Sequence, residues 1–183
     1  MKKAALTFGL IGGVLVIIYS AILFMTFGDF GNMPLDKLGI LEVMGYLNYL
    51  ILILAIFFAM RAQKKEWSES GQSMKYMSIV KVGLMVSFIV ALFVGIGEFI
   101  YISINPEFFN QYGDLMVRKL EAGGASAQEI TDLRQSMEDF KWMQNPIGSG
   151  VFYFFESFVI GAVIAFIFGI FLRPKNKVSM AQA

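Results

Sequence analysis

The sequence predicts an all-α integral membrane protein: a four-helix bundle that carries an amphipathic helical hairpin on its outer face, between the third and fourth spans. Of the 183 residues, 57% are hydrophobic and the mean hydropathy is +0.65, which is too apolar for a soluble domain of this size. Four windows have the ~20 apolar residues that a helix needs to cross a bilayer. The alternating pattern of a barrel strand is missing, which leaves helices as the spanning form.

The first span is predicted over residues 4–27 and follows two lysines. Lysines before an apolar stretch are also typical of a signal peptide. This stretch, however, is longer than the apolar part of an ordinary signal peptide and has no small-residue cleavage site. We therefore expect a retained span, followed by a second over residues 38–60 and a third over residues 76–104.

Cationic side chains predict the orientation of these spans. Nine lie on the side that holds both termini: Lys2, Lys3, Arg61, Lys64, Lys65, Lys75, Arg173, Lys175 and Lys177. Five lie on the other side, spread over a much longer stretch: Lys37, Arg118, Lys119, Arg134 and Lys141. By the positive-inside rule, both termini are expected in the cytoplasm.

The segment between the third and fourth spans is expected to form two amphipathic helices. Asn105–Pro106 suits the entry to the first helix and Gly123–Gly124 its end. Six side chains recur there at helical spacing: Phe108, Phe109, Tyr112, Leu115, Met116 and Leu120. Ser126 stands three residues before Glu129, which predicts a capping box at the start of the second helix. Asn145–Pro146 is expected to stop that helix.

The fourth span is predicted over residues 147–172, after a hairpin of about residues 106–146, and the chain forms one domain, 1–183. Glu156 lies inside this apolar run, where an isolated charge is costly. The topology is expected to bring Glu42 of the second span and Glu98 of the third to a similar depth in the outer leaflet. Each acid also has a tyrosine on its own helical face: Tyr46 for Glu42, Tyr101 for Glu98 and Tyr153 for Glu156.

These three acids and three tyrosines are a candidate cation or proton cluster, because a phenol can donate to a carboxylate. Three carboxylates in a low-dielectric bundle cannot all be ionised without a counter-charge. They can share protons, bind a hard cation through oxygen ligands, or meet basic groups of the hairpin. Four such basic groups are available: Arg118, Lys119, Arg134 and Lys141. Whether a metal binds stays open.

Small residues predict where the helices pack closely. They are Gly9 and Gly13 in the first span, Gly95 in the third, and Ser157, Gly161, Ala165 and Gly169 at four-residue spacing in the fourth. No cofactor is expected, since the absence of Cys and His removes thiolate ligands, His-containing zinc sites and an axial haem histidine. With a net charge of +1 and no basic stripe, nucleic acid is not an expected partner.

An ordered set of residues resembles a known family along almost the whole chain. The set comprises Gly45, Tyr46, Lys81, Gly83, Glu98, Tyr101, Pro106, Phe109, Tyr112, Gly124, Ala125, Ser126, Asn145, Pro146, Glu156, Gly161 and Arg173. It resembles a bacterial family of four-span membrane proteins catalogued as domain of unknown function 4199. The resemblance implies a multi-pass protein of the bacterial inner membrane and no established activity.

The sequence favours a non-enzymatic accessory, assembly or self-associating subunit, whose partners are the lipid bilayer and either itself or other membrane subunits. The alternative is a cation- or proton-coupled transport or sensing element built on the three acids. Against this alternative stands the absence of broken helices, inverted repeats and acids near the bilayer midplane. An enzyme is not expected, because no nucleophile, metal-binding histidine or nucleotide motif accompanies the carboxylates.

Overall fold

The computed structural model describes residues 2–71 and 75–172, and in these ranges the chain is helical apart from short connections. Its elements are α1 (Lys2–Phe27), α2 (Leu35–Gly45), α3 (Leu47–Glu69), α4 (Tyr76–Ile104), α5 (Phe108–Ala122), α6 (Ala127–Asp139), the 3₁₀ turn η1 (Lys141–Gln144) and α7 (Pro146–Leu172). Within the described part of the chain, four segments are long and apolar enough to cross a membrane: Lys3–Phe27, Leu35–Glu69, Tyr76–Ile104 and Pro146–Leu172. The predicted all-α membrane fold with four spans is confirmed, and the chain is a multi-pass membrane protein.

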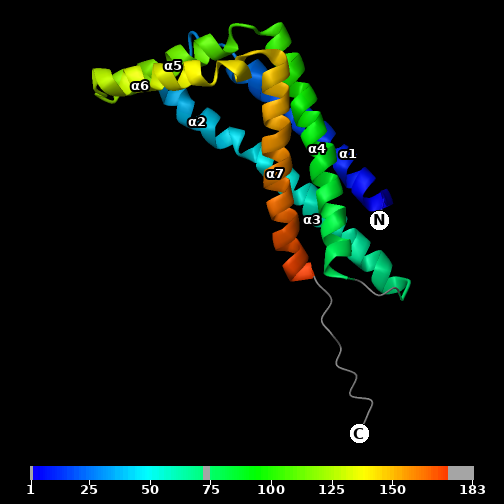
Figure 1. Ribbon diagram of the computed structural model, residues 1–183. Coiled ribbons are helices and arrows are strands. Elements are labelled where there is room, and N and C mark those ends of the chain that lie inside the picture. The colour runs from blue at the N-terminus through cyan, green and yellow to red at the C-terminus, as the bar shows by residue number, and fades with distance from the viewer. Residues whose placement is uncertain (1, 72–74, 173–183) are drawn as a thin grey trace.

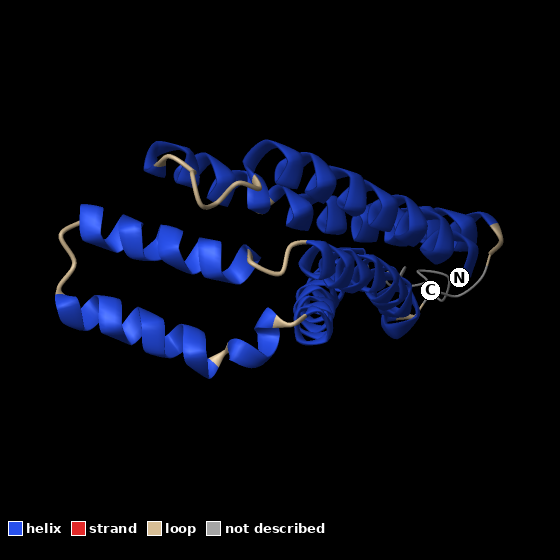
Figure 2. Ribbon diagram, turned by 90° about the horizontal axis from the view of Figure 1, so that it is seen from above, coloured by secondary structure: helices blue, strands red, loops and turns tan. Residues whose placement is uncertain are grey.

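Three of the cationic residues used to predict the orientation, Arg173, Lys175 and Lys177, lie outside the described residues. Among the described residues, the start of α1, the end of α3 and the end of α7 lie at one end of the bundle (Figure 1). The α5–α6 hairpin lies at the opposite end, which we call the hairpin end. Seen from above, its two helices run side by side and extend away from α4 and α7 (Figure 2).

The central helix is α4, which packs most extensively against α7 and next against α1. Of its most apolar 18-residue window, 56% is buried, against 22–28% in the other three spans. The outward face of α7 carries large apolar side chains, among them Val151, Phe155 and Val159, of which 46–58% is exposed. A helix that is apolar on its exposed face is typical of a segment surrounded by lipid.

Small residues form the contact between α4 and α7. Gly95 lies against the backbone of Gly150, and Ser87 lies against Gly161. Further along the same line, Gly83 lies against Ala165 and Gly169 lies against Val80 and Tyr76; Ser157 is also buried. Small residues at four-residue spacing let two helix backbones approach closely, which maximises dispersion contacts where lipid provides no hydrophobic driving force.

The contact between α1 and α4 is built in the same way. Gly9 lies against Ile89, and Gly13 lies against the ring of Phe93. The small residues expected to pack helices therefore lie in contacts within this chain. They are not left free on its surface for contacts with a second subunit.

The predicted second span differs from the structure, because it is two helices rather than one. The break falls at Tyr46, between α2 and α3. Tyr19 of α1 donates a hydrogen bond of 2.7 Å to the carbonyl of Met44, just before the break. The same carbonyl also accepts the backbone N–H of Tyr46, and the phenol of Tyr19 adds a second donor where lipid offers none. The expectation of unbroken spans is corrected at this position.

The hairpin has the predicted capping box, in which Ser126 and Glu129 exchange side-chain and backbone hydrogen bonds. The predicted end of its second helix is wrong, because α6 ends at Asp139 and not at Asn145–Pro146. The Oδ1 atom of Asn145 accepts the backbone N–H of Gly148 at 2.9 Å, and Pro146 is the first residue of α7. An amide cap followed by proline starts a helix as readily as it stops one, since proline has no N–H to leave unpaired.

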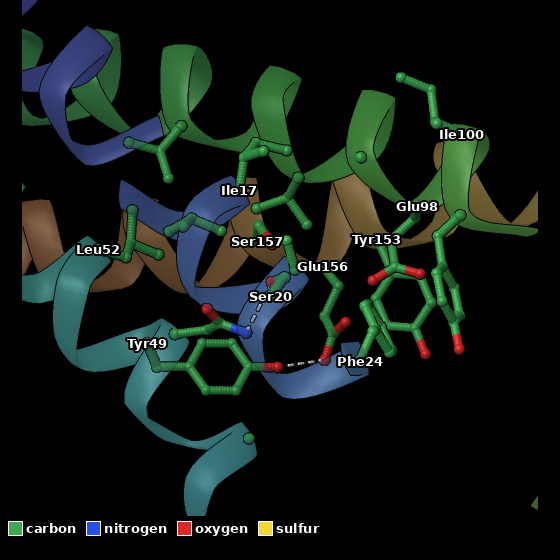
Figure 3. A pocket seen from close by; sticks show the side chains of 18 of the residues that line it. Ile17, Ser20, Phe24, Tyr49, Leu52, Glu98, Ile100, Tyr153, Glu156 and Ser157 are labelled. Carbon is green, nitrogen blue, oxygen red and sulfur yellow. Dashed lines mark hydrogen bonds between the residues drawn. The ribbon is translucent and has the colours of Figure 1, made fainter. Parts of the chain in front are cut away.

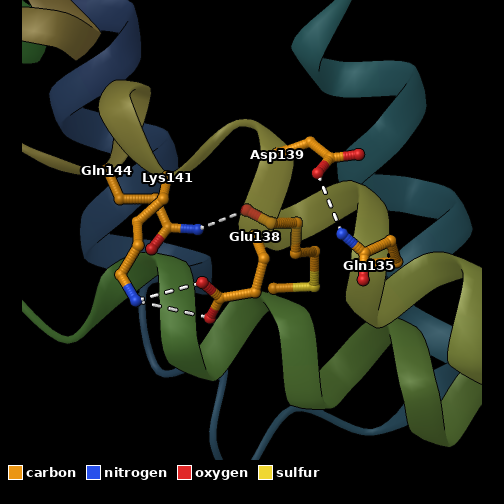
Figure 4. A network of polar contacts seen from close by, with 6 residues as sticks. Gln135, Glu138, Asp139, Lys141 and Gln144 are labelled. Carbon is orange, nitrogen blue, oxygen red and sulfur yellow. Dashed lines mark hydrogen bonds and ion pairs between the residues drawn. The ribbon is translucent and has the colours of Figure 1, made fainter.

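Side-chain contacts hold the turn from α6 to α7 (Figure 4). Lys141 pairs with Glu138 at 3.1 Å, and Gln144 donates to the carbonyl of Met137 at 3.1 Å. Gln135 donates to Asp139 at 3.0 Å within α6. The Gln144 contact gives the Met137 carbonyl a side-chain donor near the point where α6 ends.

The hairpin is attached to the connection between α1 and α2. A small apolar cluster of Phe30, Met33, Leu38 and Leu115 joins the connection and α2 to α5. Arg118 of α5 donates to the carbonyls of Phe30 at 3.0 Å and of Gly31 at 3.1 Å. The hairpin therefore fixes the position of α2 at the hairpin end.

Replacing Gly161 by alanine is expected to destabilise the protein, because the new methyl group would lie 2.5 Å from Ser87 Oγ and 2.7 Å from its Cβ. Overpacking a well-packed interior costs about 1–3 kcal/mol. We expect the free energy of unfolding, measured by denaturant titration in detergent micelles, to fall by this amount. Gly39→Ala is the matched control, since nothing lies within 4 Å of a methyl group at that position. Equal losses in both variants would contradict the packing described.

Candidate functional site

A cavity of about 760 Å³ lies between α1, the α2–α3 break, α4 and α7, in the half of the bundle nearest the hairpin. It reaches from Leu52 and Val90 in the interior to Asn105 at the end of α4. Its volume falls in the range of roughly 300–1,000 Å³ that is typical of small-molecule sites. All six residues of the candidate cluster line it: Glu42, Glu98, Glu156, Tyr46, Tyr101 and Tyr153.

Glu98 and Glu156 are brought together by the antiparallel packing of α4 and α7. The contacts of Gly95 with Gly150 and of Ser87 with Gly161 place Glu156 opposite about Ala91. Glu98 is seven residues further along α4, or about 10 Å nearer the hairpin end. The acids were expected at similar depth, and the backbone positions of these two differ by about 10 Å within the same half of the bundle.

Side-chain direction closes much of this gap. Cα–Cβ bonds tilt toward the N-terminus of their own helix. Glu98 therefore leans away from the hairpin end along α4, while Glu156 leans toward it along α7. Both carboxylates line the same cavity, and Figure 3 shows Glu98 beside the ring of Tyr153, with Glu156 directed toward Tyr49.

The phenol that binds Glu156 comes from a different helix than expected. Tyr49 of α3 donates its hydroxyl to Glu156 Oε1 at 2.8 Å. Tyr153, the partner expected from its place on the same helix, lies next to Glu98 instead (Figure 3). The only sequence signal for Tyr49 was its polarity, together with Asn48, in an otherwise apolar span. A contact between residues 107 positions apart leaves no pattern in the local sequence.

Glu42 forms an ion pair with the hairpin and so differs from the other two acids. Lys119 of α5 donates to Glu42 Oε1 at 2.7 Å, and about half of each side chain is exposed. The hydrogen bond to Glu42 raises the pKa of the Lys119 ammonium above its ordinary value. Burial and the Glu42 charge raise the pKa of the nearby Tyr112 phenol, so that it stays neutral. Pairing with a basic group of the hairpin was one of the expected alternatives for the acids, and it is the one found for Glu42.

The other two acids have no such cation. Among residues 2–71 and 75–172, neither Glu98 nor Glu156 takes part in an ion pair. Two basic groups expected near the acids bind elsewhere: Arg118 binds backbone carbonyls and Lys141 pairs with Glu138. Nor does the described part of the chain contain a group of three or more acidic side chains placed to hold one metal ion. The cavity thus holds two carboxylates without a counter-charge.

One wall of the cavity was missed by the sequence analysis, because it belongs to α1, which carries no charged residue near this depth. Phe24 stacks on the ring of Tyr101 with a centroid separation of 3.6 Å and an interplanar angle of 14°. Ser20 accepts a hydrogen bond of 3.3 Å from the amide of Asn48, whose own Oδ1 is buried without a partner among the described residues. Tyr46 is 69% exposed and lies at the rim.

Comparison with known proteins gives one match. The family model described as "Protein of unknown function (DUF4199)" matches residues 7–174. The chain matches no curated protein and no solved structure.

Tyr49→Phe is expected to lower the free energy of unfolding by about 1.5–3 kcal/mol, the value typical of a hydrogen bond to a charged group. The matched control is Tyr46→Phe, since Tyr46 lies three residues away and its hydroxyl makes no hydrogen bond in the described part of the chain. Denaturant titration in detergent measures both. A loss no larger in Tyr49→Phe than in Tyr46→Phe would exclude a stabilising contact with Glu156.

The ion pair between Lys119 and Glu42 is expected to break at high pH. A raised pKa means that its contribution is complete below the ordinary value of 10.5 and is lost as the pH rises through the raised value. Because the chain has no cysteine, spin labels at Ile40→Cys and Glu121→Cys can report the distance between α2 and α5. We expect this distance to lengthen or its distribution to broaden above pH 10.5.

Lys119→Arg is the control for this measurement. A guanidinium stays charged over the whole pH range, so the labelled distance should not change in this variant. The same change with lysine and with arginine would show that another group is responsible.

Proposed function

The chain belongs to the DUF4199 family, and we propose that it is a cation-binding membrane protein in which Glu98 and Glu156 hold a positively charged ligand. The ligand occupies the cavity at the hairpin end, and its binding serves transport or sensing. The single observation that carries this proposal is the presence of two carboxylates on one cavity with no cationic partner among the described residues.

The electrostatic free energy of the two carboxylates supports the proposal. Two like charges in a low-dielectric interior are unfavourable unless a cation or protons neutralise them. Hydrogen bonding offsets part of this cost at Glu156, through Tyr49. A fold that retains such a pair close to a cavity is therefore stabilised by a ligand of opposite charge.

The interruption at Tyr46 bears on one of the arguments against this function, but it is a single residue that keeps helical backbone angles of φ −66° and ψ −19°. Interrupted helices next to a binding site are common in transporters, because a break frees backbone groups and lets one half of a span move. Here the break lies on the rim of the cavity, and α2 is held by the hairpin through Lys119.

An accessory or self-associating role, the function favoured by the sequence, has less support. It rests on the stripes of small residues and on the exposed side chains of the hairpin, and of these the small residues Gly161, Ala165 and Gly169 pack against α4 of the same chain. The proposal also places both termini in the cytoplasm and the hairpin outside. The lysines and arginines at the end of α3 and before α4 support this orientation.

The test is the double variant Glu98→Gln/Glu156→Gln. At pH 9 and low salt, we expect the variant to be more stable than the wild type, because it lacks two like charges that share one partly buried cavity. NaCl, KCl, CaCl₂ and alkylammonium chlorides are then added at constant ionic strength. At least one should raise the unfolding temperature of the wild type, and none should do so in the double variant.

Glu121→Gln removes one exposed carboxylate of α5 and is the matched control. It should keep both the stability and the cation response of the wild type. A double variant that is no more stable than the wild type and responds to the same cations would contradict the proposal.

A further inference from the structure

We propose that the cation is an amphiphilic organic ammonium, whose charged group lies between Glu98 and Glu156 and whose apolar tail extends into the bundle. This inference rests on the function proposed above and names the chemical class of the ligand. Three features of the cavity carry it: its volume, the aromatic rings around the carboxylates, and the apolar wall beyond them.

The volume argues against a bare metal ion. A metal ion is held by several oxygen ligands at about 2–2.6 Å, and such a site needs only a small space. The cavity of about 760 Å³ is far larger, and the described residues place no third acid with Glu98 and Glu156. A ligand of drug size fills a cavity of this kind and leaves little room for water.

The rings around the two carboxylates favour an ammonium group. Tyr49, Tyr101 and Tyr153 line the cavity, and Phe24 stacks on Tyr101. The faces of such rings attract ammonium groups, most strongly where water is excluded, and they give no comparable advantage to a strongly hydrated inorganic ion. Glu98 is partly buried, makes no hydrogen bond in the described part of the chain and faces the cavity. It is therefore placed to receive the charge of the ligand.

The wall on the far side from the hairpin is mostly apolar, and Ser20 and Ser157 also line the cavity between Leu52 and Glu156. Val16, Ile17, Leu52, Val90 and Val94 line this part of the cavity. Figure 3 shows Leu52 and Ile17 displaced from Glu98 along the cavity, with Glu156 between them and Glu98. A ligand that carries its charge at one end and an alkyl or aryl group at the other matches this division.

Glu42 does not compete for the charge. Its carboxylate is already paired with Lys119 at 2.7 Å, at the rim of the cavity. The negative charge available to a ligand is therefore concentrated on the two acids inside. A monovalent ammonium and one proton together neutralise them.

The experiment compares four probes by calorimetry with the full chain in nanodiscs of phosphatidylglycerol. They are hexyltrimethylammonium, butyltrimethylammonium, tetramethylammonium and hexanesulfonate. We expect affinity to rise about fourfold for each methylene that enters the apolar part of the cavity. Tetramethylammonium should bind at least tenfold more weakly than the hexyl probe, and hexanesulfonate should not bind specifically.

Two variants test separately the contributions of the charged group and of the apolar tail to binding. In Glu98→Gln/Glu156→Gln, the difference between hexyltrimethylammonium and hexanesulfonate should disappear. In Val94→Phe, which fills part of the apolar wall, the hexyl probe should lose affinity while tetramethylammonium keeps it. Unfolding temperatures without ligand show that each variant is folded, and Glu121→Gln should behave as the wild type.

The outcomes distinguish this inference from the proposed function. If NaCl, KCl or CaCl₂ stabilises the wild type and the ammonium probes show no dependence on tail length, the organic ligand is excluded and the cation site stands. If no cation binds, both are excluded. Repeating the titration with phosphatidylethanolamine in the nanodisc identifies the source of the ammonium. Competition indicates an aminolipid, and its absence indicates a free amphiphile.

Discussion

The close contact between α4 and α7 is the constraint on which the site depends. Gly95 meets Gly150 and Ser87 meets Gly161, so the two backbones approach as closely as small residues permit. That contact fixes the register of two antiparallel helices. The register determines which side chains of α4 and α7 lie at the same depth along the bundle axis. Because side chains lean toward the start of their helix, the side chains of Glu98 and Glu156 lean toward a common level from backbone positions about 10 Å apart in depth. A shift of register by one turn would change their separation in depth by about 5.4 Å.

The cavity exists because the α2–α3 segment does not continue this close packing to the hairpin end. α3 packs tightly near its other end, where Ile56, Ala59 and Met60 are fully buried. On α2, by contrast, the buried residue is Leu38, and it packs against the hairpin and not against α4. The break at Tyr46, with the Met44 carbonyl satisfied by Tyr19, lets the two halves of the segment follow different neighbours. The hairpin thus holds α2 in place and leaves space beneath it.

Much of the fold was predictable because lipid imposes simple requirements on a sequence. Residues 76–104 had to be helical and long enough to span, and the bounds of α4 agree with that prediction. The capping box of Ser126 and Glu129 was predictable because it is local. The role of Asn145–Pro146 was not, since the same pair is compatible with the end of one helix and the start of the next.

The site was predictable as a set of residues lining one space, and not as a set of contacts. Topology alone put Glu42, Glu98 and Glu156 in one half of the bundle. The depth of each acid depends on the register between neighbouring helices. That register is set by contacts between small residues, and the hydropathy of the sequence does not predict it. For the same reason the sequence suggested a tyrosine on the same helix for Glu156, whereas the structure brings Tyr49 from another.

Glu42 is paired with a lysine while the two inner acids are not, and this difference follows from the exposure of Glu42 to solvent and to the hairpin. Glu42 is half exposed and meets Lys119 at a surface where solvent screens both charges, so this pair holds the hairpin to α2 without demanding a ligand. Glu98 and Glu156 are partly buried and face a cavity lined mostly by apolar and aromatic side chains, where two charges interact more strongly than at the surface. Such a pair can be neutralised by protons or by a bound cation, and the two compete for one place. Proton binding and ligand binding are then coupled without a conformational change between distant sites, because both neutralise the same two carboxylates.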